Sequence, residues 1–119
     1  MQPEMRMHVP APKSGMTDRD LQKLSATARD VSDFLKALSH HTRLIILCLL
    51  TEGEKTVGQL EESLGIQQAM VSQQLARLRP DGPVSGRREG RLIYYSVAHP
   101  HTTSLLHFLF AMFPGTQDN

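Results

Sequence analysis

The stretch that decides the fold is "TVGQLEESLGIQQAMVSQQLARLR", residues 56–79. Thr56, with a glutamine three residues later, has the spacing of a capping box and predicts a helix over "VGQLEESL". Gly65 is expected to end that helix, because glycine adopts the left-handed C-cap conformation without steric cost. A further helix should begin at Gln67 or Gln68. Two helices joined by so short a turn predict a helix-turn-helix.

The second of these helices has two unlike faces. Its apolar residues share one stripe at helical spacing: Met70, Val71, Leu75 and Leu78. Small and polar residues occupy the other side: Ala69, Ser72, Gln73 and Ala76. The second helix of a helix-turn-helix lies in the DNA major groove, where small residues permit close approach and amide side chains can pair with adenine. Gln74 falls within the apolar stripe, so we interpret it as a structural hydrogen-bonding residue.

Positive charge is concentrated in one part of the chain. Residues 65–97 contain five arginines and two acidic residues, whereas the formal net charge of the whole chain is +1. A local excess of arginine is typical of proteins that bind phosphate backbones. Charge alone also fits an arginine-rich surface exposed to solvent.

Amphipathic spacing and turn residues predict the remaining elements. A first helix should run from Thr17 to about Leu38, and "SHHTRLIILCLLTEGE" should form a short helix that ends near Glu52-Gly53. After the break at "DGP", "PVSGRR" and "RLIYYSV" predict two strands that turn around Glu89-Gly90. A hairpin placed after a helix-turn-helix is a wing.

The last expected helix, "TSLLHFLFAMF", is apolar over more than half of its circumference. So small a domain has too little core to cover that surface, which favours an oligomer interface shared with the first helix. The residues expected in a homodimer interface are Leu21, Leu24, Val31, Leu105, Leu109 and Phe113.

The predicted fold class is mainly α with a small β-hairpin: a dimeric winged helix-turn-helix of five helices plus the wing. Residues 17–114 should form the DNA-binding and dimerisation domain, between a disordered tail over 1–16 and a C-terminal tail over 115–119. No apolar run is long enough for a transmembrane span, and the first 16 residues lack the apolar centre of a signal peptide, so no membrane association is expected. One cysteine, Cys48, fits a reducing, cytoplasmic setting.

These patterns predict a protein that binds double-stranded DNA. The residues expected to contact it are Thr56, Gln67, Gln68, Ser72, Gln73, Arg77, Arg79, Arg87, Arg88 and Arg91. Two alternatives remain: a surface helix of a helical bundle, and a winged helix that binds protein. No nucleophile elbow, phosphate-binding loop or convergent carboxylate pair is visible, so neither an enzyme nor a cofactor is expected.

Three segments carry a resemblance to a known family: "FLKALSHHTRLIILCLL", "TVGQLEESLGIQQAMVSQQLARLR" and "RREGRLIYYSV". Together they resemble the ArsR/SmtB family of winged-helix bacterial repressors over about residues 30–97. The resemblance implies a homodimer that binds a palindromic operator and releases it when a small inducer arrives. Within the family, the chain looks most like the sulfide-responsive branch, whose sensors use two cysteines per subunit.

Cys48 matches the first sensing position of that branch, but Pro114 stands where the second cysteine would fall. The resemblance therefore implies no disulfide within one subunit. Cys48 is either a sensing thiol for reactive sulfur or oxidants, or a packing residue, since free cysteine is among the most buried residue types. His40, His41 and Arg43 lie nearby in sequence, and a contact with any of them would lower the pKa of the thiol.

The resemblance also implies a second kind of sensing, because other members of the family respond to metal ions. Their thiolate motif would fall in "TVGQLEESL", which has no cysteine. His99 and His101 match the histidine or acidic pair that opens the last helix at a second family site, while residues 111–113 supply no ligand at its far end. His107 lies about 120° around that helix from His101. A metal-responsive repressor that uses His99 and His101 therefore stays the alternative. The favoured interpretation is that these two histidines are solvated or serve in packing.

Overall fold

The computed structural model describes residues 15–79 and 82–115. The predictions of a disordered tail over 1–16 and of a C-terminal tail over 115–119 fall almost wholly outside these residues. Contacts between residues divide the chain into two compact units, one ending at Asp33 and the other starting at Phe34. The boundary falls inside α1 (Asp18–Leu38), the first helix.

Helix α1 begins where the sequence predicts. The Thr17 hydroxyl accepts a hydrogen bond from the backbone N–H of Asp20, and the Asp20 carboxylate accepts one from the N–H of Thr17, both at 3.1 Å. This reciprocal pair satisfies two N–H groups that the first helical turn leaves without partners. The acidic side chains of the first turn also suit the positive end of the helix dipole.

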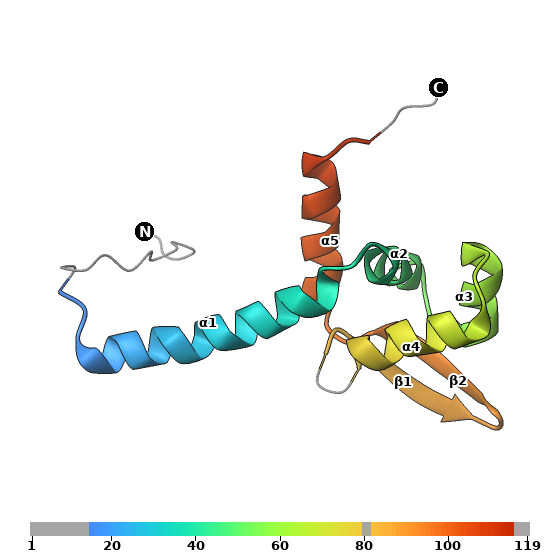
Figure 1. The fold of residues 1–119 in the computed structure, drawn as a ribbon, viewed down its shortest axis with the longest axis horizontal. Helices are drawn as coiled ribbons and strands as arrows, with labels where there is room; N and C mark the ends of the chain where they lie inside the picture. The colour runs from blue at the N-terminus through green and yellow to red at the C-terminus, as the bar shows by residue number, and fades with distance from the viewer. Residues whose placement is uncertain (1–14, 80–81, 116–119) are drawn as a thin grey trace. The chain divides into compact units, whose positions relative to one another are not determined.

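The second unit contains four helices and a hairpin among its described residues (Figure 1). The helices after α1 are α2 (His41–Leu50), α3 (Val57–Leu64), α4 (Gln68–Leu78) and α5 (Pro100–Met112), and the strands are β1 (Val84–Glu89) and β2 (Leu92–Val97). The predicted class, mainly α with one hairpin in a winged helix-turn-helix order, is confirmed. Two expected bounds were wrong: α2 ends at Leu50, before the turn that includes Gly53, and α5 starts at Pro100.

Helices α3 and α4 form the helix-turn-helix. The Thr56 hydroxyl accepts from the backbone N–H of Gln59 at 3.2 Å, and the Gln59 side chain accepts from the N–H of Thr56 at 2.9 Å, which confirms the capping box. Gly65 has φ 70°, and its N–H donates to the carbonyl of Glu61 at 2.8 Å, so the helix stops there. A side chain at this φ would be strained, which explains the glycine.

The core is built from the inner faces of the helices and from β2. Its fully buried side chains include Ile46 and Leu47 on α2, Leu60 on α3, and Val71, Leu75 and Leu78 on α4. Burying each such side chain contributes roughly 1.5–3 kcal/mol relative to leaving it exposed. Contacts of α2 with α4 and β2, and of α5 with β2, join the helices and the hairpin around this core.

The hairpin pairs β1 and β2 antiparallel, from Val84 opposite Val97 to Glu89 opposite Leu92. The turn is therefore Gly90-Arg91, one residue later than predicted, with Gly90 at φ 65°. Lys55, between α2 and α3, exchanges two backbone hydrogen bonds with Tyr95 of β2, at 2.8 and 3.0 Å. These bonds attach the hairpin to the loop that precedes α3.

Candidate nucleic-acid interface

The exposed face of α4 carries the side chains that the sequence assigns to base reading. Gln68, Ser72 and Gln73 are exposed, together with the small residues Ala69 and Ala76. The opposite face is buried in the core. The helix therefore presents a continuous polar surface of small residues and amides that can approach a nucleic-acid groove.

One residue of the predicted apolar stripe lies elsewhere. Met70 is 47% exposed, while Val71, Leu75 and Leu78 are buried. At about 100° per residue, Met70 lies about 90° from the centre of the buried face, and Gln74 lies nearer to it. Met70 thus lies at the edge of the apolar stripe, outside the buried core.

Gln74 is buried, as predicted, and makes a structural hydrogen bond. Its Oε1 accepts from Nη1 of Arg43 at 2.9 Å, and both side chains are 8% exposed. Sequence reasoning placed Gln74 correctly but missed Arg43 as its partner. The missed signal was a cation in the first turn of α2, where the helix dipole disfavours positive charge.

The arginines at the end of α4 and on the hairpin are exposed but differ in what surrounds them. Arg77 lies on the last turn of α4, and Arg79 follows it with its guanidinium 5.5 Å from the centre of the Tyr95 ring. Arg88 and Arg91 lie at the tip of the hairpin. Among residues 15–79 and 82–115, no carboxylate lies within ion-pair distance of Arg77, Arg88 or Arg91.

Arg87 is bound to two carboxylates instead. Its guanidinium donates to both oxygens of Glu54 at 2.8 and 2.9 Å, to Glu89 at 3.1 Å, and stacks 4.8 Å from the Tyr94 ring centre. The hydrogen bond from Arg87 lowers the pKa of the exposed Glu54 carboxyl. Arg87 thus ties β1 to the loop before α3, a role that its distance from Glu54 in sequence concealed.

Gly86 allows the hairpin to pack. It lies opposite Tyr95 in the ladder, and a Cβ at this position would come within 3.2 Å of the Tyr95 ring. That distance is shorter than ordinary van der Waals contact. The glycine therefore leaves room beside β1 for the buried Tyr95 ring, whose other contact is the Arg79 guanidinium.

Thr56 and Gln67 border α3 and α4 at their N-terminal ends. Thr56 is half-buried and its hydroxyl oxygen already accepts from Gln59, which leaves the hydroxyl proton available to a phosphate. Gln67 is the exposed N-cap residue of α4 and makes no side-chain capping bond. Both residues lie where backbone N–H groups at helix starts favour an anion.

Cys48 lies on α2, half-buried beside core residues. Burial raises the pKa of its thiol, which is the opposite of the lowering considered from His40, His41 and Arg43. The guanidinium of Arg43 is directed to Ala37 and Gln74 instead. In this form the thiol is less ionised at neutral pH than an ordinary cysteine.

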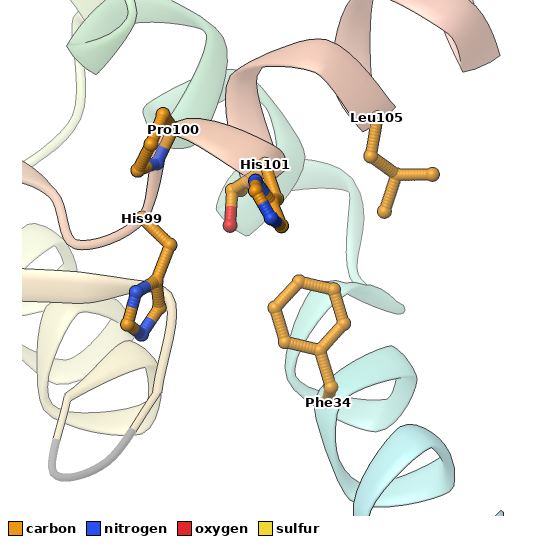
Figure 2. Close-up of a pocket in the computed structure, with 6 residues that line it drawn as sticks. Phe34, His99, Pro100, His101 and Leu105 are labelled. Carbon is orange, nitrogen blue, oxygen red and sulfur yellow. The ribbon is translucent and has the colours of Figure 1, made fainter.

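A cavity of about 390 Å³ lies where α5 begins. It is lined by Phe34, His99, Pro100, His101, Thr102 and Leu105, and Figure 2 shows the Phe34 ring approaching from α1 while His101 and Leu105 project from α5. No group of three or more histidine, cysteine or acidic side chains suited to a metal ion occurs in the described part of the chain. Within residues 15–79 and 82–115 of one subunit, the metal-responsive alternative thus has no complete ligand set.

The residues expected in a dimer interface include strongly exposed apolar side chains. On α1, Leu21 and Val31 are about half exposed and Leu24 is half-buried. On α5, Leu105 and Leu109 are half-buried and Phe113, just beyond its end, is 71% exposed. Other exposed apolar residues nearby are Leu35, Phe108, Phe110 and Met112. None of the described helices is long and apolar enough to span a membrane.

Comparison with known proteins gives consistent matches. Residues 40–85 match the family model described as "Bacterial regulatory protein, arsR family". The chain is 41% identical over 98 residues to the biofilm growth-associated repressor of Xylella fastidiosa, covering 82% of this chain and 83% of that protein. Two similar solved structures are the repressor BigR from X. fastidiosa (37% identity, TM-score 0.67, covering 82% and 99%) and reduced HlyU from Vibrio cholerae (31%, 0.71, 79% and 99%).

Proposed function

The chain belongs to the arsR family of bacterial regulatory proteins and is a DNA-binding transcriptional regulator, and we propose that it represses transcription as a homodimer on a near-palindromic operator. The supporting observation is the two-faced character of α4. One face exposes amides and small residues, and the opposite face buries Val71, Leu75 and Leu78 in the core. Such a helix, held by α3 through the Gly65 turn, suits the major groove.

Gln68, Ser72 and Gln73 are the proposed base-reading residues. Gln68 and Gln73 offer a donor and an acceptor that match the N6 and N7 edge of adenine, and Ser72 can reach a base or a phosphate. Thr56 and Gln67 are proposed phosphate contacts at the helix starts. Sequence preference in this scheme comes from α4, and the other contacts position the protein.

Arginines are proposed to contact DNA at the end of α4 and on the hairpin. Arg77 lies on the last turn of α4 and Arg79 directly follows that helix, while Arg88 and Arg91 lie at the hairpin tip. They would bind phosphates or enter the minor groove. Arg87 belongs to the predicted set as well, but its pairing with Glu54 and Glu89 offsets its charge.

A homodimer is proposed because α1 and α5 expose more apolar surface than a monomeric regulator of this size should tolerate. Two recognition helices must also reach successive major grooves, roughly 34–36 Å apart on one face of the duplex. The proposed anchors are Leu105, Leu109 and Phe113 on α5 and Leu21, Leu24 and Val31 on α1. A cytoplasmic location stays a prediction.

Release of DNA by a small inducer completes the proposal. Cys48 is its candidate for a covalent switch, through reactive sulfur or oxidants. A modified side chain would strain the packing of α2. The raised pKa of the thiol favours the packing interpretation.

The experiment begins by selecting bound duplexes from a random-sequence library with the wild-type protein. We expect a near-palindromic site with half-sites one helical turn apart. Gln73→Ala should then lose about 1–3 kcal/mol of discrimination at one base pair of each half-site. His107→Ala, on the exposed side of α5, serves as the control and should leave discrimination unchanged. Selection that returns no shared sequence would refute specific binding.

A further inference from the structure

Arg43 is an unusual side chain for the place it occupies. It is a cation in the first turn of α2, where the positive end of the helix dipole disfavours it, and it is 8% exposed. No carboxylate pairs with it among the described residues. A buried charge without an ion-pair partner needs hydrogen bonds to compensate for lost hydration.

Three hydrogen bonds supply that compensation. Nε donates to the carbonyl of Ala37 at 2.6 Å, Nη2 to the carbonyl of Lys36 at 3.3 Å, and Nη1 to Oε1 of Gln74 at 2.9 Å. The two carbonyls belong to the last turn of α1, which carries the negative end of that helix dipole. The guanidinium therefore caps α1 and holds α4 at the same time.

The link reaches α4 beside its exposed face. Gln74 directly follows Ser72 and Gln73, the proposed base-reading residues. Because a guanidinium is planar and rigid, its donors have fixed relative directions, and the carbonyls and the amide must meet them together. A rotation of α4 relative to the end of α1 would break at least one of these bonds.

We propose that Arg43 is a positioning residue that fixes the orientation of α4 relative to the last turn of α1, through its buried hydrogen bond to Gln74. This inference rests on the proposed function, since α1 belongs to the proposed dimer interface. In a dimer held by α1 and α5, this orientation sets the separation of the two α4 helices. Arg43 thereby determines which half-site spacing the dimer accepts.

The test uses the full-length protein and a duplex selected by the wild type. Affinities are measured for that duplex, for versions with half-sites one base pair closer or farther apart, and for an unrelated duplex. Gln74→Met keeps the length of the side chain but removes the acceptor. It should reduce the ratio of selected to unrelated affinity about tenfold, or about 1.4 kcal/mol, and flatten the preference for spacing.

Companion variants separate positioning from general stability. Gln74→Glu retains an acceptor for Arg43 and should keep both the ratio and the spacing preference. Arg43→Lys keeps the charge but loses the planar fork, so it should behave like Gln74→Met, and the double variant should add little. Ile46→Val is the matched control, because it removes a core methyl group from α2 without touching these bonds.

Two results would overturn the inference. One is a folded Gln74→Met protein that keeps the wild-type affinity ratio and spacing preference. The other is an Ile46→Val protein whose Tm falls as much as that of Gln74→Met and which loses the affinity ratio and the spacing preference to the same extent. If Gln74→Met does not fold, Gln74→Asn replaces it, since its shorter side chain cannot span the bond to Arg43.

Hydrogen exchange distinguishes this failure from failure of the proposed function. In Gln74→Met, amides of α4 and of the last turn of α1 should both exchange faster, while those of α3 should not. If the wild type shows no specific DNA binding, the proposed function fails and this exchange pattern alone decides whether Arg43 links the two helices. Unchanged exchange in both segments would then reject the link.

Discussion

Replacing Arg88 with alanine tests which arginines of the hairpin hold DNA. Arg88 has no carboxylate within ion-pair distance among the described residues, whereas Arg87 is bound by both oxygens of Glu54 and by Glu89. An arginine already paired in this way must give up those bonds before it binds a phosphate. The two neighbouring residues should therefore contribute unequally to DNA binding.

The magnitude follows from counterion release. Each phosphate contact contributes about 0.9 to the slope of log K against log salt concentration, so a dimer with one Arg88 contact per subunit should lose about 1.8 in Arg88→Ala. Arg87→Ala should lose clearly less. Because phosphate contacts carry no sequence information, Arg88→Ala should weaken selected and unrelated duplexes alike.

Fluorescence anisotropy of a labelled duplex, repeated between low and moderate salt, measures both slopes. Glu54→Gln is the informative control, since it frees one side of the Arg87 guanidinium. Its salt slope should be steeper than that of the wild type. Circular dichroism melting confirms that all three variants are folded. Equal flattening of the slope in Arg87→Ala and Arg88→Ala would refute the assignment of unequal roles.

Three further predictions concern assembly, pH and the thiol. Leu109→Asp should yield monomers in sedimentation at micromolar concentration while His107→Asp stays dimeric, and a dimeric Leu109→Asp protein would reject α5 as the interface. By NMR, the pKa of the Glu54 carboxyl should lie below its ordinary value and should rise in Arg87→Ala. The pair should therefore stabilise the fold at pH values above the ordinary glutamate pKa, and this stabilisation should be lost as pH falls through the lowered pKa. If Cys48 is the covalent switch, polysulfide treatment should add mass at Cys48 and release DNA together; an unmodified Cys48, or a Cys48→Ser protein that is released equally, would end the thiol-switch hypothesis.

Features decided by local chemistry could be predicted from the sequence. The capping box at Thr56, the left-handed Gly65 and the turn glycine Gly90 each act within a few residues, so the order of the helices and the hairpin followed from them. Gln74 was also predictable, because its angle on α4 places a polar side chain among buried ones. These features define the helix-turn-helix and its exposed face.

Features decided by distant partners were not predictable. Arg87 and Glu54 are 33 residues apart, and Arg43 and Gln74 are 31 apart, so no periodicity marks either pair. The exposure of Met70 was not predictable either, because helical spacing shows which residues share a stripe but not how much of it the neighbouring helices cover. Tertiary packing determines both of these pairs and the exposure of Met70.

These pairings change what the arginine-rich segment means. Counted from sequence, residues 65–97 have an excess of positive charge, but Glu54, outside that segment, neutralises part of it through Arg87. Among the described residues, no carboxylate lies within ion-pair distance of Arg77 and Arg79 at the end of α4, or of Arg88 and Arg91 at the hairpin tip. Because phosphate binding depends on charge at these two ends, the hairpin must be held at a fixed place relative to α4. The two backbone hydrogen bonds between Lys55 and Tyr95 attach the hairpin to the loop before α3 independently of Arg87, so Glu54→Gln should free the charge of Arg87 without displacing the hairpin.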